Sequence, residues 1–166
     1  VGDTIMLTTG KSRRMLLSVS LCLLAAFAFT PVSAQVRRAK AQTLYVPVYS
    51  HIYYGDRERD YILLSATLSV RNTDMAKSIT LLSADYYDSK GKFIEKFVVK
   101  PVTLGPLETV RYIVKESDTR GGTGANFLVT WHSKSNASAP LVESVMIGTA
   151  GQQGISFTSR GVPVRD

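Results

Sequence analysis

This 166-residue sequence contains two histidines, His51 and His132, which are the side chains best suited to transfer a proton or bind a metal near neutral pH. They lie on separate predicted elements, and no His-x-x-x-His spacing joins them. Asp56 and Asp60 follow His51 closely, so one hypothesis is a hydrolytic or metal-dependent site in which a carboxylate approaches the imidazole. The alternative, which we favour, is a loop histidine that hydrogen-bonds the backbone. We therefore predict no catalytic residues and no enzymatic activity.

The segment Asp56–Asp60 places a carboxylate at every second position, an arrangement also found in calcium loops. The glycine and the distal glutamate of such loops are absent, and the interleaved arginines would repel a divalent cation. A self-paired, solvent-exposed loop is therefore favoured. The single cysteine, Cys22, precedes the predicted folded region, so we expect no thiolate ligand and no disulfide there. We predict neither a metal nor a cofactor.

Two glycine-rich stretches raise the question of phosphate binding. Residues Gly121–Gly124 lack the Lys-Ser/Thr pair of a nucleotide-binding loop, and no predicted helix follows them. Residues Gly148–Gly154 combine three glycines with two glutamines and precede Ser156 and Arg160, so they offer backbone donors and neutral amides at close approach. Such groups suit sugars or peptide strands. The structural alternative is a simple turn between two strands.

Tyrosines are concentrated near the start of the predicted domain. Five of the eight lie between Tyr45 and Tyr61, and a tyrosine ring combines apolar area with a polar tip. We predict that this segment and the second glycine-rich stretch bind a protein or a glycan of the cell envelope. The alternatives are tyrosines that pack at the rim of the fold and a domain with a purely structural role in envelope assembly. The candidate binding residues are Tyr49, His51, Tyr53, Tyr54, Gln152, Gln153, Ser156 and Arg160.

Residues 11–34 have the three parts of a secretory signal peptide: a basic start, an apolar run over Met15–Phe29, and small residues that end at Ala34. The apolar run is shorter than the roughly 20 residues that a membrane-spanning helix needs. We expect cleavage after Ala34 and a periplasmic or extracellular location. The alternative is an uncleaved anchor, which is the only membrane contact expected. Lipidation of Cys22 is disfavoured, because Leu21 occupies a position that requires a small side chain.

Alternation of apolar and polar side chains predicts β-strands through the rest of the chain, most clearly over residues 64–71. Pro47 marks the first strand as an edge or bulged strand. Trp131 is expected in the core, with His132 on the opposite face of its strand. The predicted strands cover 44–49, 64–71, 79–87, a return strand with Phe93, Phe97 and Val99, 110–115, 127–131, 141–147 and 155–158. The predicted connections include a turn at Asn72–Asp74, a hairpin turn at Asp88–Gly91 and a polar segment over 133–140.

Seven or eight short strands in a chain of this size predict an all-β fold, a single immunoglobulin-like or fibronectin-like antiparallel β-sandwich that follows an N-terminal signal helix. Its basic excess is concentrated in the leader and in Arg37, Arg38 and Lys40, so we expect no nucleic-acid partner. The predicted divisions are a signal peptide with upstream residues (1–34), a basic flexible linker (35–42), the sandwich domain (43–161) and a C-terminal tail (162–166).

Four segments together resemble a bacterial domain-of-unknown-function family, number 3124. They are YVPVYSHIYYGDRERDYILLSATLSVRNTD, DYYDSKGK, GGTGANFLVTW and VMIGTAGQQGISFTSRG, and the resemblance spans roughly Gln42 to Gly161. The resemblance implies an exported or lipid-anchored envelope protein without an assigned activity, so no catalytic residue carries over from the family. The chain departs from the lipid-anchored members because it has no credible lipidation motif.

Overall fold

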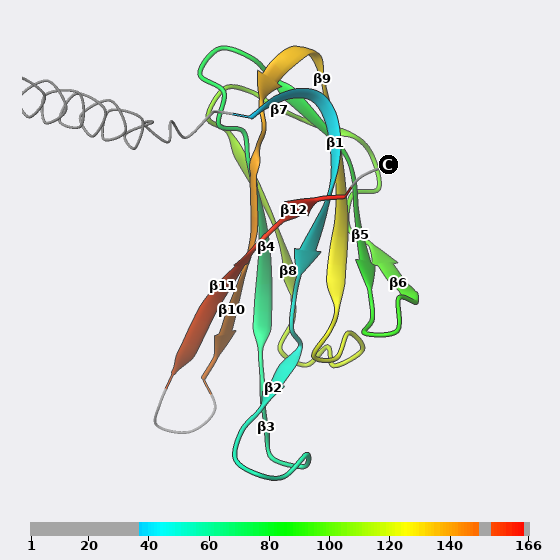
Figure 1. Ribbon diagram of the computed structural model, residues 1–166, viewed down its shortest axis with the longest axis vertical. Coiled ribbons are helices and arrows are strands. Elements are labelled where there is room, and N and C mark those ends of the chain that lie inside the picture. The colour runs from blue at the N-terminus through cyan, green and yellow to red at the C-terminus, as the bar shows by residue number, and fades with distance from the viewer. Residues whose placement is uncertain (1–36, 150–153, 165–166) are drawn as a thin grey trace, which may run out of the picture. The chain divides into compact units, whose positions relative to one another are not determined.

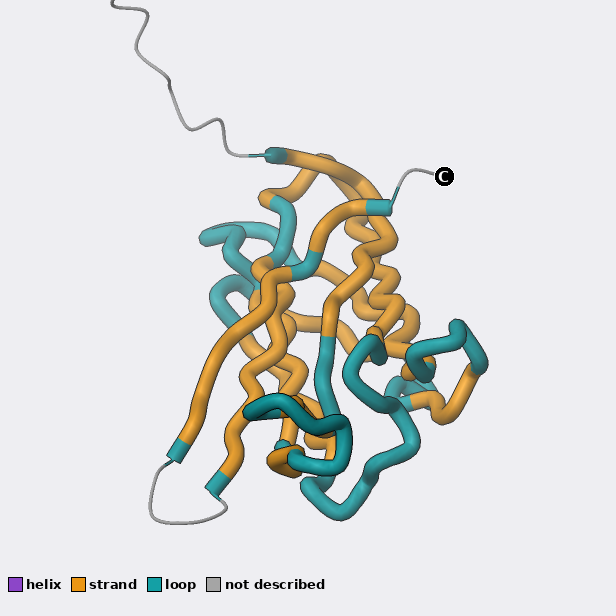
Figure 2. The backbone as a smooth tube through the Cα atoms, turned by 60° about the horizontal axis from the view of Figure 1, so that its bottom comes forward, coloured by secondary structure: helices purple, strands orange, loops and turns teal. Residues whose placement is uncertain are grey.

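The computed structural model describes residues 37–149 and 154–164, in which every regular element is a β-strand (Figure 1). All strand pairs among these residues are antiparallel, and Figure 2 shows strands and loops only, so the all-β prediction is confirmed. The predicted leader, with Cys22 and the cleavage site after Ala34, lies outside the described residues. None of the described segments forms a helix of the length and hydrophobicity needed to cross a bilayer.

The described part of the chain contains twelve strands, more than the seven or eight predicted, because pieces of two or three residues are too short to show alternation. In chain order they are β1 (Arg38–Pro47), β2 (His51–Tyr53), β3 (Tyr61–Leu63), β4 (Ser65–Arg71), β5 (Ile79–Tyr87), β6 (Phe93–Lys96), β7 (Val102–Leu104), β8 (Thr109–Val114), β9 (Asn126–Ser138), β10 (Leu141–Gly148), β11 (Ile155–Arg160) and β12 (Val162–Pro163). One sheet has the order β12-β1-β9-β5-β6, with β7 also paired to β5; a second has the order β11-β10-β4-β8; β2 and β3 form a separate hairpin.

The two larger sheets face each other across one hydrophobic core. Period-2 alternation explains its composition, since alternate side chains of each strand point to the same face. Trp131 on β9 is fully buried, as predicted, and Ser144 on β10 donates its hydroxyl hydrogen to the carbonyl oxygen of Pro47 on β1. Core residues of the six-stranded sheet include Leu44, Val46, Leu81, Ala84, Tyr86, Phe127, Val129 and Trp131; those of the four-stranded sheet include Ala66, Leu68, Val70, Val114, Val142 and Met146.

The side chains of strand β5 that point into the core change from odd to even positions halfway along the strand. Its pairing with β9 slips between Leu81 and Ser83, so Leu82 is an extra residue with no partner, and its side chain is exposed. A β-bulge of this kind reverses the side-chain phase. Leu81 therefore points into the core before the bulge, and Ala84 points into the core after it.

The boundaries of three predicted segments are wrong. β1 begins at Arg38, so residues 38–42 of the predicted flexible linker belong to a strand, and β9 extends to Ser138 through most of the predicted polar connection. Arg38 pairs with Ser138, so each polar strand end is the hydrogen-bonding partner of the other, and this pairing outweighs a weak local strand preference. In the same way, Val162 in the predicted C-terminal tail pairs with β1 as part of β12.

The predicted turn between β5 and β6 is confirmed. Gly91 has φ 76°, and its amide donates to the carbonyl oxygen of Asp88. Glycine takes this left-handed conformation without a Cβ clash. The return strand is shorter than predicted, because β6 ends at Lys96, before Phe97 and Val99.

Candidate functional site

The β2–β3 hairpin presents an aromatic face to solvent. Its register pairs His51 with Leu63, Ile52 with Ile62 and Tyr53 with Tyr61. Because neighbouring side chains alternate between faces, the two isoleucines share one face, and they pack against the core. The same alternation places His51, Tyr53 and Tyr61 together on the opposite face.

The rings of His51, Tyr53 and Tyr61 form one cluster, named here the aromatic cluster. Ring centroids lie 5.3 Å apart for His51 and Tyr53, 5.2 Å for His51 and Tyr61, and 6.3 Å for the two tyrosines. These separations and the tilted or edge-on ring planes are those of favourable aromatic pairs. Tyr53 is 53% exposed and Tyr61 50%, so half of each tyrosine surface remains open to a ligand.

Ser50 fixes the base of this hairpin to the rest of the domain. Its buried hydroxyl donates to the carbonyl oxygen of Gly122 (3.2 Å) and accepts from the Gly122 amide (2.9 Å), and its own amide also donates to the Gly122 carbonyl. On the other face of the hairpin, Gly148 allows β10 to approach closely, since a Cβ there would lie 2.8 Å from a methyl carbon of Ile62. The aromatic cluster is therefore held on a supported hairpin.

The hairpin lies beside the Gly148 end of β10 at the lower end of the domain in Figure 1. Figure 2, in which this end is turned forward, shows loops beside the ends of several strands there. The ring of Tyr49 lies edge-on to Phe157 of β11, with centroids 5.6 Å apart, and both side chains are partly buried against the core. The β2–β3 hairpin therefore contacts β10 through Ile62, and a binding surface shared with the second glycine-rich stretch stays a prediction.

The remaining predicted binding residues do not all join this surface. Tyr54 is 56% exposed at the end of β2 but forms no ring pair with the cluster. Ser156 and Arg160 alternate with Phe157 along β11, so they project from the opposite face of that strand, and both are exposed. Gln152 and Gln153 lie outside the described residues.

The histidine and acidic residues do not form a catalytic arrangement here. Neither Asp56 nor Asp60 makes an ion pair or hydrogen bond with His51, and the polar neighbour of the imidazole is the Ser50 hydroxyl, 3.3 Å from Nδ1. That hydroxyl is already engaged by Gly122. Among residues 37–149 and 154–164, no group of three or more potential metal ligands is found.

The loop at Gly121–Gly124 has a structural role. The Gly124 amide donates to the Ser89 hydroxyl (2.9 Å), and that hydroxyl donates to the Gly121 carbonyl (2.9 Å). Ser50 holds Gly122 from the other side. Since these loop amides are satisfied within the domain, they are not open to bind an anion.

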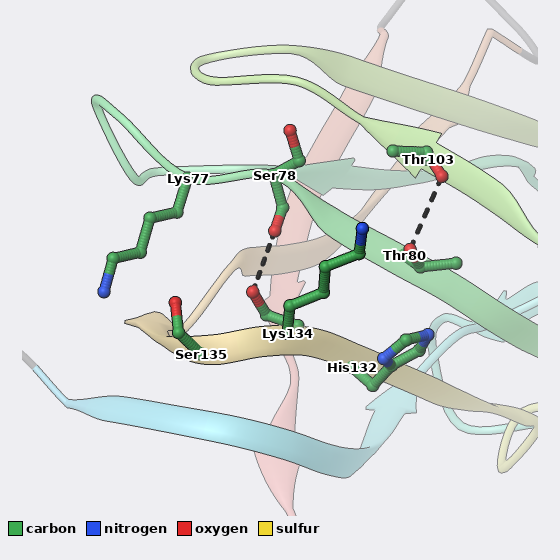
Figure 3. A pocket seen from close by; sticks show the side chains of 8 residues that line it. Lys77, Ser78, Thr80, Thr103, His132, Lys134 and Ser135 are labelled. Atoms are coloured by element: carbon green, nitrogen blue, oxygen red, sulfur yellow. Dashed lines mark hydrogen bonds between the residues drawn. The ribbon is translucent and has the colours of Figure 1, made fainter.

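A second polar site was missed by the sequence reasoning. A depression of about 420 Å³ lies on the outer face of the six-stranded sheet, at the end of the domain opposite the β2–β3 hairpin. Figure 3 shows its side chains, which come from the start of β5 and the two residues before it, from β7 and from the second half of β9. They include Lys77, Ser78, Thr80, Thr103, His132 and Lys134. His132 does face away from the core, but the sequence does not reveal that distant hydroxyls and lysines meet it.

The turn Asn72–Asp74 supports one wall of this depression. The buried Asp74 carboxylate accepts hydrogen bonds from the backbone amides of Ala76, Lys77 and Ser138. These backbone hydrogen bonds, chiefly the one from Ser138, lower the pKa of Asp74 to about 2 from its ordinary value of 3.8. The carboxylate therefore ties the β4–β5 turn to the end of β9.

Substitution of Asp74 by asparagine is expected to lower the free energy of unfolding at pH 7. It should also make that free energy depend less on pH in the acid range. A carboxyl group whose pKa is lower in the folded state contributes stability above its unfolded pKa, and the protein loses that contribution as the pH falls from about 4 to 2. The stability difference between wild type and Asp74→Asn, measured by urea denaturation, should therefore shrink across this range. Asp56→Asn, in the exposed β2–β3 turn, is the control; a pH-independent difference for Asp74→Asn would contradict the prediction.

The aromatic cluster includes one residue, Tyr61, that the sequence did not indicate as a candidate binding residue. Tyr61 belongs to it because it pairs with Tyr53 across the hairpin. A second aromatic contact joins Phe157 to Tyr49, and both side chains are partly buried against the core. A hairpin turn centred on the residues after Tyr54 would have predicted the first pairing. No local signal would have predicted the second, because the contact joins residues far apart in the sequence.

The fold and the site define a β-rich domain of two antiparallel sheets with an exposed aromatic hairpin. The chain belongs to the family described as "Protein of unknown function (DUF3124)", whose model matches residues 41–164. The resemblance deduced from the sequence is thereby confirmed. No curated protein matches the chain. A solved structure described as "Crystal Structure of Thermotoga maritima 1070" is similar at 12% identity, with 74% of this chain and 94% of that chain covered and a TM-score of 0.42.

Proposed function

We propose that this protein is an exported cell-envelope module that binds a protein or glycan partner through the aromatic cluster and the adjoining β10–β11 hairpin. The observation that carries the proposal is the cluster itself, in which two half-exposed tyrosines and His51 share one solvent-facing surface. The role is binding rather than catalysis. In this proposal the facing sheets are an immunoglobulin-like or fibronectin-like sandwich that acts as the scaffold.

The chemistry of the cluster supports a recognition role. Tyrosine rings supply a large apolar area at a small cost in side-chain entropy, and their hydroxyls donate and accept hydrogen bonds. Both a sugar ring and an extended peptide can stack on such a surface. The cluster is also rigid at its base, because Ser50 and Gly122 hold the hairpin and the rings support one another. A preformed surface loses less entropy when it binds.

The proposed location depends on the leader. The basic, apolar and small-residue parts of residues 11–34 support export with cleavage after Ala34, into the periplasm or to the outside of the cell. The amino-terminal sequence of the protein recovered from cells tests this step. A chain that begins at Gln35 in the exported fraction is expected, and an uncut chain in the cytosol would contradict it.

The double variant Tyr53→Ala/Tyr61→Ala is expected to weaken partner binding at least about thirtyfold, because exposed tyrosines at an interface centre commonly contribute about 2 kcal/mol or more. A photo-crosslinking amino acid at position 53 should capture a protein partner in cells, and co-sedimentation with purified cell-wall glycan tests the other partner class. The binding strength of wild type and variant is then measured with whichever partner these assays identify.

Phe93 offers a matched control, since it is 51% exposed on β6, far along the chain from the hairpin, and forms a ring pair with Tyr87. Phe93→Ala should leave partner binding unchanged, and a crosslinker at position 93 should capture nothing in common with position 53. Equal capture at both positions, or undiminished binding by the double variant, would overturn the proposal.

A further inference from the structure

The depression at the opposite end of the domain is built on a row of side chains that crosses three strands. Thr103 on β7 pairs with Thr80 on β5, and Thr80 pairs with His132 on β9. Their neighbours Leu81 and Trp131 point into the core, so the row lies on the outer face. Adjacent strands are about 4.8 Å apart, so the row spans about 10 Å of sheet surface.

Positive charge lies over this row. Lys134 is two residues beyond His132 on β9, and Figure 3 shows it extending toward the Thr80–Thr103 pair. Lys77 lies at the margin, where its ammonium group donates to the carbonyl oxygen of Asn136. Among the described residues no carboxylate forms an ion pair with either lysine. A negatively charged ligand would therefore not compete with a paired carboxylate for either lysine.

The side chains around the depression can donate more hydrogen bonds than they must accept. Thr80 and Thr103 lie 3.4 Å apart through their hydroxyl oxygens, so one hydroxyl hydrogen of the pair remains available to a ligand. The Ser78 hydroxyl is a further donor, and the Lys134 ammonium group carries three. A ligand rich in acceptor oxygens and poor in donors fits such a surface.

We propose that this depression binds a phosphoryl group carried as a monoester on a small hydroxylated molecule, with Lys134 as the main charged contact. A phosphate monoester presents three terminal oxygens and up to two negative charges, which match an ammonium group above several hydroxyl donors. The volume of about 420 Å³ exceeds that of a phosphate ion and lies in the range of small-molecule sites. The remaining space accommodates the part of the molecule that carries the phosphate.

The walls of the site are held in place before a ligand arrives. The Ser133 hydroxyl donates to the Ser78 carbonyl oxygen (2.9 Å), so β9 and the start of β5 are joined beneath the depression. Asp74 fixes the Lys77 amide on the adjoining turn (3.0 Å). A preorganised wall reduces the ordering cost of binding.

Isothermal titration calorimetry of the purified protein with glucose 6-phosphate tests the proposal. Wild type should bind glucose 6-phosphate more tightly than glucose or glucuronate. Glucose has the same ring without the charge, and glucuronate carries a carboxylate in place of the phosphoryl group. Lys134→Ala should weaken binding at least tenfold. Thr80→Val, which keeps the charge and removes a hydroxyl, should weaken it about three- to tenfold.

Lys90→Ala is the matched control, because it removes the same charge from the exposed β5–β6 turn. It should change the affinity less than twofold, and Tyr53→Ala/Tyr61→Ala should leave it unchanged, which separates this site from the proposed partner surface. Vesicles with phosphatidic acid distinguish a lipid source. If wild type binds these vesicles but not glucose 6-phosphate, and Lys134→Ala abolishes the vesicle binding, the phosphoryl group belongs to a lipid headgroup. Equal affinity for glucuronate, equal loss in Lys90→Ala, or no binding to either phosphorylated probe would overturn the proposal.

Discussion

Replacement of Trp131 with alanine is expected to lower the free energy of unfolding by about 3–5 kcal/mol, the cost typical of removing a large aromatic side chain from a core. Trp131 is fully buried at the centre of β9, with Gln42 and Leu81 as its neighbours on the flanking strands. A domain of this size has a total stability of about 5–15 kcal/mol, so the variant would lose a large part of it. Urea denaturation followed by circular dichroism measures the change.

Trp131→Phe tests the cavity explanation. Phenylalanine keeps most of the ring volume, and it removes an indole N–H that has no acceptor among the described residues. Burial of such a group without a partner costs free energy, so the phenylalanine variant should lose much less stability than the alanine variant. The exposed Phe93→Ala should stay within about 0.5 kcal/mol of wild type. Equal losses in both Trp131 variants would contradict the cavity explanation.

Asn72→Asp is expected to destabilise the protein by about 3 kcal/mol or more, although the two side chains have nearly the same shape. The buried Asn72 amide nitrogen shares its two hydrogens among the carbonyl oxygens of Lys77 (2.8 Å), Leu104 (3.2 Å) and Gly105 (2.7 Å). Aspartate would place a charged oxygen against these three acceptors, and each would lose its donor. Urea denaturation at pH 7 measures the loss.

The matched control is Asn136→Asp, the same chemical change at an exposed position near the end of β9. Its effect should stay within about 0.5 kcal/mol, as is usual for surface substitutions. Asn72→Ala separates charge from hydrogen bonding, because it removes the donor without adding a negative oxygen, so it should destabilise less than Asn72→Asp. If the Asn72→Asp and Asn136→Asp effects were similar, the buried amide would not have the stabilising role that its contacts indicate.

The elements of the fold were predictable where the local pattern is strong. β4 alternates through its whole length with one face in the core, and Gly91 occupies a turn that needs a positive φ. The pattern fails in β5, where the bulge at Leu82 reverses the side-chain phase, and in residues 38–42, where strand formation depends on pairing with the distant end of β9. These features depend on partners that the local sequence does not contain.

The candidate sites divide in the same way. The density of tyrosines indicated the segment between Tyr45 and Tyr61 as a candidate, but the pairing of Tyr53 with Tyr61 in a hairpin selected the residues that form the aromatic cluster. Ser156 and Arg160 were predicted to join it, and they lie on the opposite face of β11 from Phe157 because a strand alternates its side chains. The composition of a segment does not reveal which of its faces meets another segment.

The amino-acid sequence by itself determined the all-β class of this protein, the burial of Trp131 and the family to which the chain belongs, because alternation and motif content are local properties of the chain. The tertiary structure alone decided that Thr103, Thr80 and His132 share one row beneath Lys134. Such rows depend on the register between strands, and a shift of one residue moves every side chain of a strand to the other face. Register is set by the packing of the whole core, so no single segment encodes it.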